Sequence, residues 1–524
     1  MNLTIRERCG KVAECLKKKG VATIKSIALA TGLSKSSVHR HKKALSARNQ
    51  HSESAFWETQ AGSEWLKLMV LGVVYYFGVK EGIGCERLSE FLESVRLGEH
   101  VGISPSAIRG LKTQIKQGII RYSEAQAEKC QQKELTGICV GGDETFFDLP
   151  VLVMMELATG FIFTEAKCEN RSYQTWYEQI QQWWTHKGWQ CHFMVSDSAP
   201  GLIKLALSGL NCASVPDLFH ALRGLARPIG SGIGRQIARL HKKLTTLQAS
   251  MVTTTVEDKR QILQQSIDII NQELQVVELA QQKYNQALHA ITLAVHPFDI
   301  DTHQWQLSST LSSSLNVPLT ELSTLALNYG TDKATKAIDT FRTQIPFLAQ
   351  GIHAWWQWVT QALATQTHVL EIQDWVLCYL LPWFYWQQQA DKTRHPELKQ
   401  RYLQAESHAH RMILDHPITQ QMHETDLQRW FVWAQWICSK YQRTSSAIEG
   451  RNGCLSRLHH TGRGFSPQTL QVLTIIHNFD TRRTDGTTPA QRLFHQTFPY
   501  LFEWVVDDLG DLPLPRKSSK SHYS

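Results

Sequence analysis

Five short apolar runs, interrupted by two amphipathic segments, are the feature that most constrains how residues 137–216 can fold. The runs cover residues 137–142, 150–157, 161–166, 191–196 and 212–216, and the first and the fourth are bounded by glycine or small polar residues. Such runs predict buried β-strands. Ala158-Thr159-Gly160 predicts a tight turn, so that the first three strands form an antiparallel meander. Residues 172–187 and 200–208 predict helices before the fourth and the fifth strand.

An aspartate ends the first and the fourth of these runs. Asp143 closes GICVGGD and Asp197 closes CHFMVSD, while a third acid, Glu449, lies far downstream in SSAIEGRNG at a predicted helix start. Three carboxylates brought together can hold two hard cations such as Mg2+, which bind oxygen ligands. Such a metal pair can clamp the attacking and leaving oxygens of a phosphodiester. The alternatives are solvated loop ends for the aspartates and, for Glu449, a carboxylate favoured by the helix dipole.

Composition is ordinary for a soluble globular protein, with 42% hydrophobic and 19% charged residues in a chain of 524, long enough for several domains. The 11 cysteines form no C-x-x-C pair, which argues against a disulfide framework or a structural zinc site and favours a reducing cytoplasm. The longest apolar stretch, residues 68–79, is too short to span a bilayer. We therefore expect a cytoplasmic protein with no membrane partner, associated with the nucleoid when it binds DNA.

The basic charge is concentrated at the N-terminus. The formal net charge is +8, and residues 1–50 contain 12 lysines and arginines against Glu7 and Glu14. Nucleic acid is the partner that such a basic segment favours.

Residues 21–45 predict a helix-turn-helix. Ile24, Ile27 and Ala28 share one face of a short helix, Gly32 supplies the turn, and Ser34 caps a second helix. The second helix turns Val38 inward and is expected to present to DNA the polar residues Lys35, Ser36, Ser37, Arg40, His41 and Lys42. The spacing is that of the DNA-binding version, whose second helix enters the major groove. A helical hairpin with a solvated basic face is the alternative.

The remaining segments are predicted to be helical. Residues 85–115 repeat the pattern of helix, glycine turn and helix, with Ser104-Pro105 opening the second helix; this module either binds DNA or packs on the core. A heptad-like spacing at residues 263–291 predicts a long helical hairpin with residues 232–252. Aromatic stripes within residues 340–440 favour a buried core over a platform for stacking bases.

Strands that end in acids, a helical insertion and a helix bearing glutamate together resemble the catalytic domain of DDE transposases from bacterial insertion sequences. Asp217-Leu218-Phe219-His220, directly after the fifth run, resembles the C/D-x-x-H motif of the Mutator-like and hAT-like branches. Those branches also interrupt the catalytic fold with helices before the glutamate. The resemblance covers roughly residues 136–224 and 439–500 and implies a ribonuclease H-like fold.

The resemblance implies Asp143, Asp197 and Glu449 as the catalytic metal ligands, with Asp217 and His220 in support. His220 would orient a phosphate or bond a ligand carboxylate; zinc ligation is disfavoured because no cysteine pair accompanies it. The implied cofactor is a pair of Mg2+ ions, for which Mn2+ can substitute. Residues 440–483 hold seven lysines and arginines against two acids, and Arg451 and Arg457 in this stretch are expected to bind DNA.

We therefore expect an α+β multidomain chain. The predicted parts are a helix-turn-helix domain (1–50), a second helical module (51–135), a ribonuclease H-like domain in two parts (136–224 and 439–505), an all-helical insertion (225–438) and a basic disordered tail (506–524). The expected function is that of a DNA transposase, which binds the terminal inverted repeats of its element and acts as a dimer or higher oligomer on double-stranded DNA. A structure-selective nuclease on the same fold and an inactive DNA-binding regulator are the alternatives.

Overall fold

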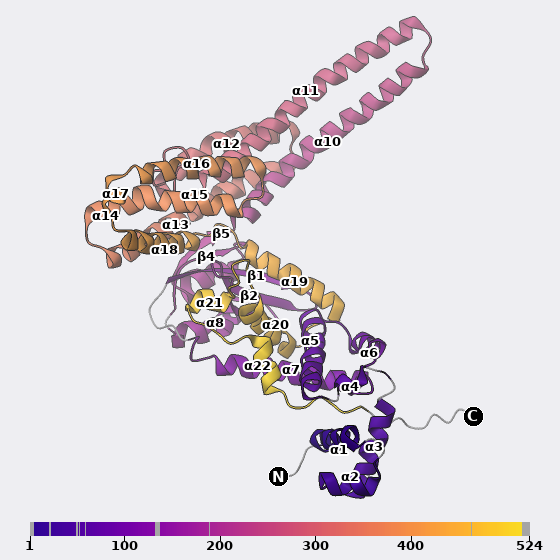
Figure 1. The fold of residues 1–524 in the computed structure, drawn as a ribbon. Coiled ribbons are helices and arrows are strands. Elements are labelled where there is room, and N and C mark those ends of the chain that lie inside the picture. Colours follow the sequence, from indigo (N-terminus) through magenta and orange to yellow (C-terminus); the bar gives the residue numbers. More distant parts are fainter. Residues whose placement is uncertain are drawn as a thin grey trace. The chain divides into compact units, whose positions relative to one another are not determined.

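The computed structural model describes residues 5–19, 22–48, 51, 53–57, 59–130, 137–187, 189–462 and 464–515. This part of the chain is α+β, as expected, and is mostly helical with one five-stranded mixed sheet (Figure 1). It divides into two compact units, one of residues 1–131 with 453–524 and one of residues 132–452. Across the described residues, no helix combines the length and the apolar character needed to cross a membrane. The functional domains expected from the sequence stay a prediction, because the compact units reflect packing alone.

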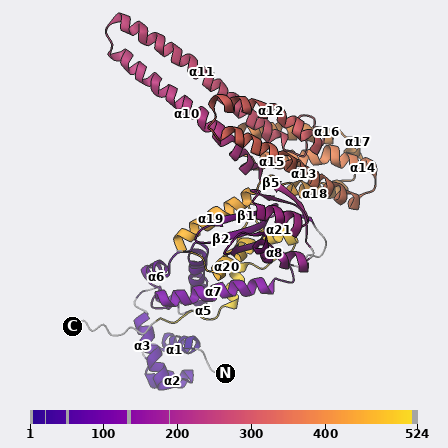
Figure 2. The same ribbon diagram turned by 180° about the vertical axis from the view of Figure 1, so that it is seen from behind.

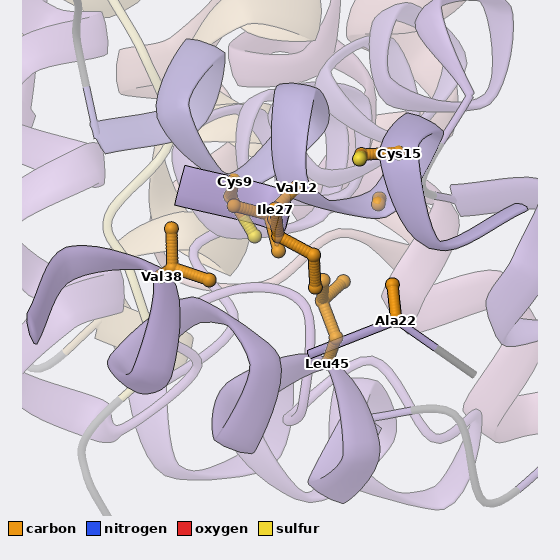
Figure 3. Close-up of a cluster of buried hydrophobic side chains, with 8 residues drawn as sticks. Cys9, Val12, Cys15, Ala22, Ile27, Val38 and Leu45 are labelled. Atoms are coloured by element: carbon orange, nitrogen blue, oxygen red, sulfur yellow. The ribbon is translucent and has the colours of Figure 1, made fainter. Parts of the chain in front are cut away.

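Three short helices at the N-terminus of the first unit pack on one another. They are α1 (Ile5–Lys19), α2 (Ile24–Thr31) and α3 (Lys35–Arg48), and their shared core includes Val12, Ile27 and Val38 (Figure 3). Gly32 ends α2 with a φ of 69°, a left-handed conformation that glycine adopts without strain. The hydroxyl of Ser34 accepts the amide of Ser37 at 3.2 Å and so caps α3. The helix, glycine turn and helix predicted here are confirmed.

The rest of the first unit joins helices from both ends of the chain. Its N-terminal elements are α4 (Ser54–Trp57), α5 (Gln60–Val73), the π-helical η1 (Val74–Lys80), α6 (Cys85–Ser94) and α7 (Pro105–Ala125). Its C-terminal elements are α20 (Pro467–Asp480), α21 (Pro489–Phe494) and α22 (Leu501–Asp508). Helix α7 packs against α20 and α22, so the second predicted helix pair contributes to this core. Helix α22 occupies the start of the expected tail, and residues 516–524 lie outside the described ones.

The sheet of the second unit consists of β1 (Gly137–Phe146), β2 (Pro150–Glu156), β3 (Ile162–Lys167), β4 (Gln190–Ser196) and β5 (Ala213–Pro216). Its strand order is β3-β2-β1-β4-β5. The first three strands are antiparallel neighbours, as predicted, whereas β4 runs parallel to β1 and β5 runs parallel to β4. The connections are α8 (Tyr173–Lys187) before β4, and α9 (Pro200–Lys204) with η2 (Leu205–Gly209) before β5. The carboxyl ends of β1, β4 and β5 therefore lie at one edge of the sheet.

A large helical insertion follows β5. Helices α10 (Leu218–Thr253) and α11 (Glu257–Ala294) form the predicted hairpin, whose far part extends away from the other helices of this unit (Figures 1 and 2). The remaining helices are α12 (Ser308–Tyr329), α13 (Ala334–Gln366), α14 (Leu370–Trp375), η3 (Val376–Leu380), α15 (Leu381–Lys392), α16 (Pro396–Leu414), α17 (Pro417–Gln421) and α18 (Glu424–Lys440). Trp355, Trp375 and Trp386 are fully buried, so the aromatic stripes form a core, as interpreted from the sequence. Helix α13 packs on β4 and β5, where Trp358 stacks on His192.

Candidate functional site

Two of the predicted acids meet at the sheet edge. Asp143 lies near the end of β1, and Asp197 directly follows β4, where Gly142 of β1 is aligned with Ser196 of β4. The carboxyl ends of parallel strands place ligand-binding residues side by side. A third acid, Glu144, joins them, and one carboxylate oxygen from each of the three acids lies within 4.8 Å of the others. Glu144 directly follows Asp143 in the same motif but was not among the site residues predicted from the sequence.

The surroundings of this cluster disfavour the charged forms of Asp143 and Glu144, so the pKa values of both acids are raised. The pKa of Asp143 is raised to about 6, mainly because the group is buried; the backbone amide of Glu144 opposes this shift, and the nearby carboxylate of Asp197 adds to it. Burial, followed by Asp197, also raises the pKa of Glu144. The Arg171 guanidinium lies 3.7 Å from a Glu144 oxygen and offsets part of this repulsion. Acids crowded in this way gain from a bound cation, which favours their charged forms.

The turn after β4 holds Asp197 on the solvent-exposed side of the cluster. Its Oδ1 accepts the backbone amide of Ala199 at 2.9 Å, and the side chain is exposed. Ser198 between them has a φ of 67°, which is uncommon for a residue other than glycine. Strained backbone of this kind often marks functional sites.

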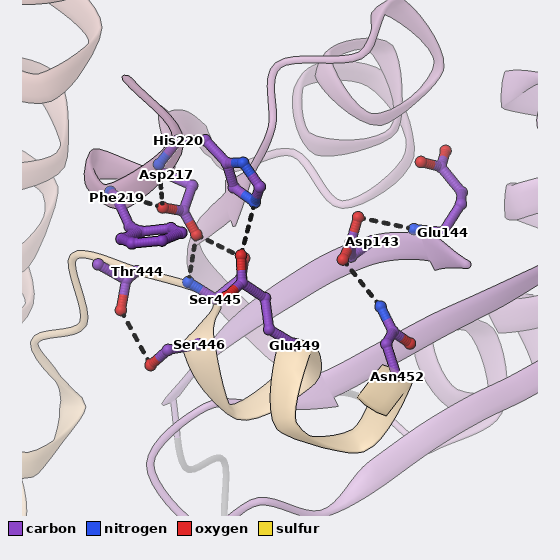
Figure 4. A network of polar contacts seen from close by, with 10 residues as sticks. All are labelled: Asp143, Glu144, Asp217, Phe219, His220, Thr444, Ser445, Ser446, Glu449 and Asn452. Atoms are coloured by element: carbon purple, nitrogen blue, oxygen red, sulfur yellow. Dashed lines mark hydrogen bonds and ion pairs between the residues drawn. The ribbon is translucent and has the colours of Figure 1, made fainter. Parts of the chain in front are cut away.

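Asp217 connects the end of β5 to a distant part of the chain. It is the N-cap of α10, and its Oδ1 accepts the amides of Phe219 and His220 at 2.7 and 3.1 Å. Its Oδ2 accepts both the amide and the hydroxyl of Ser445, at 2.6 and 2.5 Å (Figure 4). Because Asp217 accepts four hydrogen bonds and is only 1% exposed, its carboxylate is fully hydrogen-bonded within the protein. It therefore supports the site by holding α10 and residue 445 together.

Helix α19 (Ser446–Gly462) brings Glu449 and Asn452 to the same edge (Figure 4). A Glu449 oxygen lies 2.9 Å from His220 Nε2, an ion-pair distance with angles outside hydrogen-bond geometry. The amide of Asn452 donates to Asp143 Oδ2 at 2.9 Å, while its own Oδ1 is buried without a hydrogen-bond partner among the described atoms. Glu449 lies beside the cluster of three carboxylates, next to His220, and is not one of them.

Two buried ion pairs hold the start of α19 and the end of α18 on the sheet. Lys440 donates to Glu156 at 2.9 Å, and Arg451 forms a two-pronged pair with Glu165 at 2.7 and 2.6 Å. Charges are seldom this buried unless they are paired. Gly141 adds room for the helix, because a Cβ there would lie 2.8 Å from Ile448 Cδ1. Glu449 is thus placed by its neighbours on α19.

The structure corrects the expectation for Arg451. The sequence analysis expects it to contact DNA, but its side chain is 7% exposed and fully engaged by Glu165. A buried guanidinium in a two-pronged pair is not free for a phosphate. Arg457, two turns along α19, is 67% exposed and 3.9 Å from Glu81.

Three of the six predicted DNA-binding residues of α3 are exposed. Lys35, Ser36 and Arg40 are exposed, whereas His41 and Lys42 are half-buried, and Lys42 donates to the carbonyl of Ala22 at 3.2 Å. Ser37 differs from the prediction, because it is 5% exposed and lies next to the inward-facing Val38. Its small side chain lets α3 pack closely on its neighbours.

Comparison with known proteins adds little to this geometry. Residues 376–521 are similar to a family of unknown function, DUF6399, a match to less than half of the chain. No curated protein and no solved structure matches the chain.

Proposed function

We propose that this protein is a DNA transposase, which cuts and joins DNA strands at a metal-dependent site built from Asp143, Asp197 and Glu449. One observation carries the proposal: two acids at the ends of adjacent parallel strands face a helix-borne acid whose helix is fixed by buried polar contacts. The meander of three antiparallel strands followed by two parallel ones supports a ribonuclease H-like domain.

The residues at this edge fit a pair of Mg2+ ions. Asp143, Glu144 and Asp197 offer carboxylate oxygens within 4.8 Å of one another, and Asn452 offers a buried oxygen that lacks a hydrogen-bond partner among the described atoms. Hard oxygen donors are the ligands that Mg2+ requires. Asp143 and Asp197 would hold the ions together with Glu144 of the same cluster, and Glu449, which lies beside the cluster, would complete the ligand set. Bound ions of this kind supply a nucleophilic oxygen and stabilise the charge that develops on the phosphate.

The other side chains position these ligands. His220 holds the Glu449 carboxylate from α10, and Asn452 holds one oxygen of Asp143 in place. Asp217 fixes the first turn of α10 and residue 445 together, so that His220 and Glu449 keep their spacing. Asp143 binds a cation in its deprotonated form. Because its pKa is raised to about 6, the metal-free carboxyl reaches this form only near neutral pH.

The substrate would be double-stranded DNA. Helix α3 presents Lys35, Ser36 and Arg40 on an exposed face, the arrangement of a recognition helix in the major groove. Twelve lysines and arginines within residues 1–50 supply the attraction to phosphate. We infer that this region binds the terminal inverted repeats and that the acids cut beside them.

The test replaces each proposed ligand by its amide. The intact chain is incubated with Mg2+ and a duplex carrying the inverted repeats that flank its coding region, and cleavage and joined products are measured. Asp143→Asn, Asp197→Asn and Glu449→Gln should each lower cleavage by at least about 1000-fold, because each removes a charged ligand. End binding should be retained.

Matched controls are Asp148→Asn and Glu169→Gln, which neutralise exposed acids close in sequence to the site. Both should cut normally. Normal cleavage by Glu449→Gln would remove Glu449 from the site and leave Glu144 as the third ligand. Failure of the unaltered protein to cut its element ends would overturn the proposal. Cutting without joining would indicate a nuclease instead.

A further inference from the structure

Helix α10 has a charge composition unlike that of its partner in the hairpin. Within Leu218–Thr253 it carries six lysines and arginines and no acid: Arg223, Arg227, Arg235, Arg239, Lys242 and Lys243. Helix α11, which packs along it, carries five acids and three bases. The positive charge is therefore confined to one arm of the hairpin.

These six cations are not used to hold the hairpin together. All are exposed, and none forms an ion pair with any residue that the structure describes, despite the acids on α11. The hairpin contact uses apolar residues such as Ile233 and Leu240, which are fully buried. Arg235, Arg239, Lys242 and Lys243 follow a spacing of four, three and one residues, which places them on one face of the helix.

A groove runs beside this face. It has a volume of about 530 Å³ and lies between the two arms, with Arg239, Lys242 and Lys243 on its α10 wall. The hydroxyl-bearing residues Thr246 and Ser266 also line it, together with the apolar residues Leu247, Ile269 and Ile270. Lysine, arginine and hydroxyl side chains are the groups that most often contact DNA phosphates.

The basic arm begins at the candidate site. Asp217 caps α10, and His220, which holds Glu449, lies in its first turn. At 1.5 Å per residue, the distance along the helix from Arg223 to Lys243 is about 30 Å. That length matches about 9 base pairs of B-form DNA at 3.4 Å per pair.

We propose that this basic face of α10 binds the phosphate backbone of duplex DNA where the DNA leaves the candidate site. The inference rests on the proposed function, because it assigns a path to the DNA that this site would cut. The ligand expected on this face is a double helix rather than a second copy of the chain. Exposed apolar residues on α11, namely Ile262, Ile269 and Val276 at intervals of seven, are what a protein partner would use instead.

The test removes four charges from the arm of the intact protein with Arg235→Gln, Arg239→Gln, Lys242→Gln and Lys243→Gln. Affinity for an end duplex with at least 12 flanking base pairs is measured over a range of salt. We expect a 10- to 100-fold loss at low salt. The slope of log affinity against log salt should become shallower by about 3 to 4, since each lost phosphate contact removes about 0.9.

The matched control removes four exposed cations elsewhere in the same unit, with Lys333→Gln, Lys336→Gln, Lys399→Gln and Arg411→Gln. It should bind as the unaltered protein does, and circular dichroism should show both variants folded. A duplex cut back to 2 flanking base pairs should bind the unaltered protein as weakly as the arm variant binds the long one.

Three results would count against the inference. Unchanged affinity and salt slope in the arm variant, with cleavage by the unaltered protein intact, would overturn it and leave the proposed function standing. Loss of self-association in sedimentation, with DNA binding unchanged, would show that the face binds protein and would also overturn it. Failure of the unaltered protein to bind or cut any end duplex would overturn both proposals.

Discussion

The two halves of the candidate site are built by different forces. Asp143 and Asp197 are carried by neighbouring parallel strands, whose backbone hydrogen bonds fix their spacing. Among the described residues, Glu449 lies on a helix that forms no backbone ladder with the sheet. Its segment is held by buried contacts of Lys440, Ser445, Arg451 and Asn452 with partners 228 to 309 residues away in sequence.

This difference determines how each half responds to change. A strand pair tolerates the loss of one side chain, because its backbone ladder persists. A helix held by buried charges does not, since removing one partner leaves the other charge without compensation. We therefore expect α19 to be displaced by changes that leave the sheet folded, and the following predictions test this from the largest effect to the smallest.

The largest effect is expected from Arg451→Met, which removes the two-pronged charge partner of the buried Glu165. Breaking a buried pair in this way costs about 3–5 kcal/mol. The free energy of unfolding from urea titration should fall by that amount, and cleavage should fall with it as α19 shifts. Arg457→Met on the exposed side of the same helix should change stability by less than about 0.5 kcal/mol.

A double substitution at both partners of the ion pair separates the cost of an uncompensated buried charge from the effect of moving α19. Glu165→Leu combined with Arg451→Met replaces the buried ion pair by apolar side chains and should recover most of the lost stability. Should the single variant prove as stable as the unaltered protein, the pair does not hold α19, and the contrast between the two halves fails.

A gain in stability is expected from Asp143→Asn. The pKa of Asp143 in the folded protein, about 6, is above its ordinary value, so the folded state binds more protons between about pH 4 and 6. Its ionisation therefore lowers the free energy of unfolding as pH rises through that window, and the full cost is present above pH 6. Without metal at pH 7.5, the asparagine variant should be more stable by about 1–2 kcal/mol after solvent screening.

Melting in EDTA at pH 7.5 and at pH 4 checks this prediction. The gain should disappear at pH 4, where the aspartate is protonated in the folded protein. Added Mg2+ should raise the melting temperature of the unaltered protein and not that of the variant, because a ligand stabilises only the state that binds it. A variant less stable than the unaltered protein at pH 7.5 would contradict the raised pKa.

The smallest effect is expected from Ser445→Ala. The change removes one donor to Asp217, but three backbone amides still satisfy that carboxylate. A hydrogen bond to a charged group contributes about 1.5 kcal/mol, and the remaining donors reduce the loss to about 1 kcal/mol. Cleavage should fall several-fold as the spacing of His220 and Glu449 loosens. Ser446→Ala, exposed and adjacent, is the control, and an equal loss in both variants would refute the special role of Ser445.

Much of the fold can be predicted from the sequence because it follows from local patterns. The five strands, their meander, the helical hairpin and the N-terminal helix pair all depend on periodicity, turn residues and caps within a few positions. The meeting of Asp143 and Asp197 was also predictable, since acids after parallel strands share an edge. The positions of Ser37 and Arg451 were not, because burial depends on what packs above a residue.

The sequence by itself determined which acids exist, which strands carry two of them, and where the basic residues gather. Only the tertiary structure decided that Glu144 joins the cluster, that Glu449 lies beside the cluster and next to His220, and that Arg451 forms an ion pair with Glu165. The physical reason is how far apart in the sequence the contacting residues lie. Backbone ladders and caps act between near neighbours and leave periodic marks, whereas a buried charge pair such as Lys440 with Glu156 joins residues 284 positions apart and leaves no local pattern.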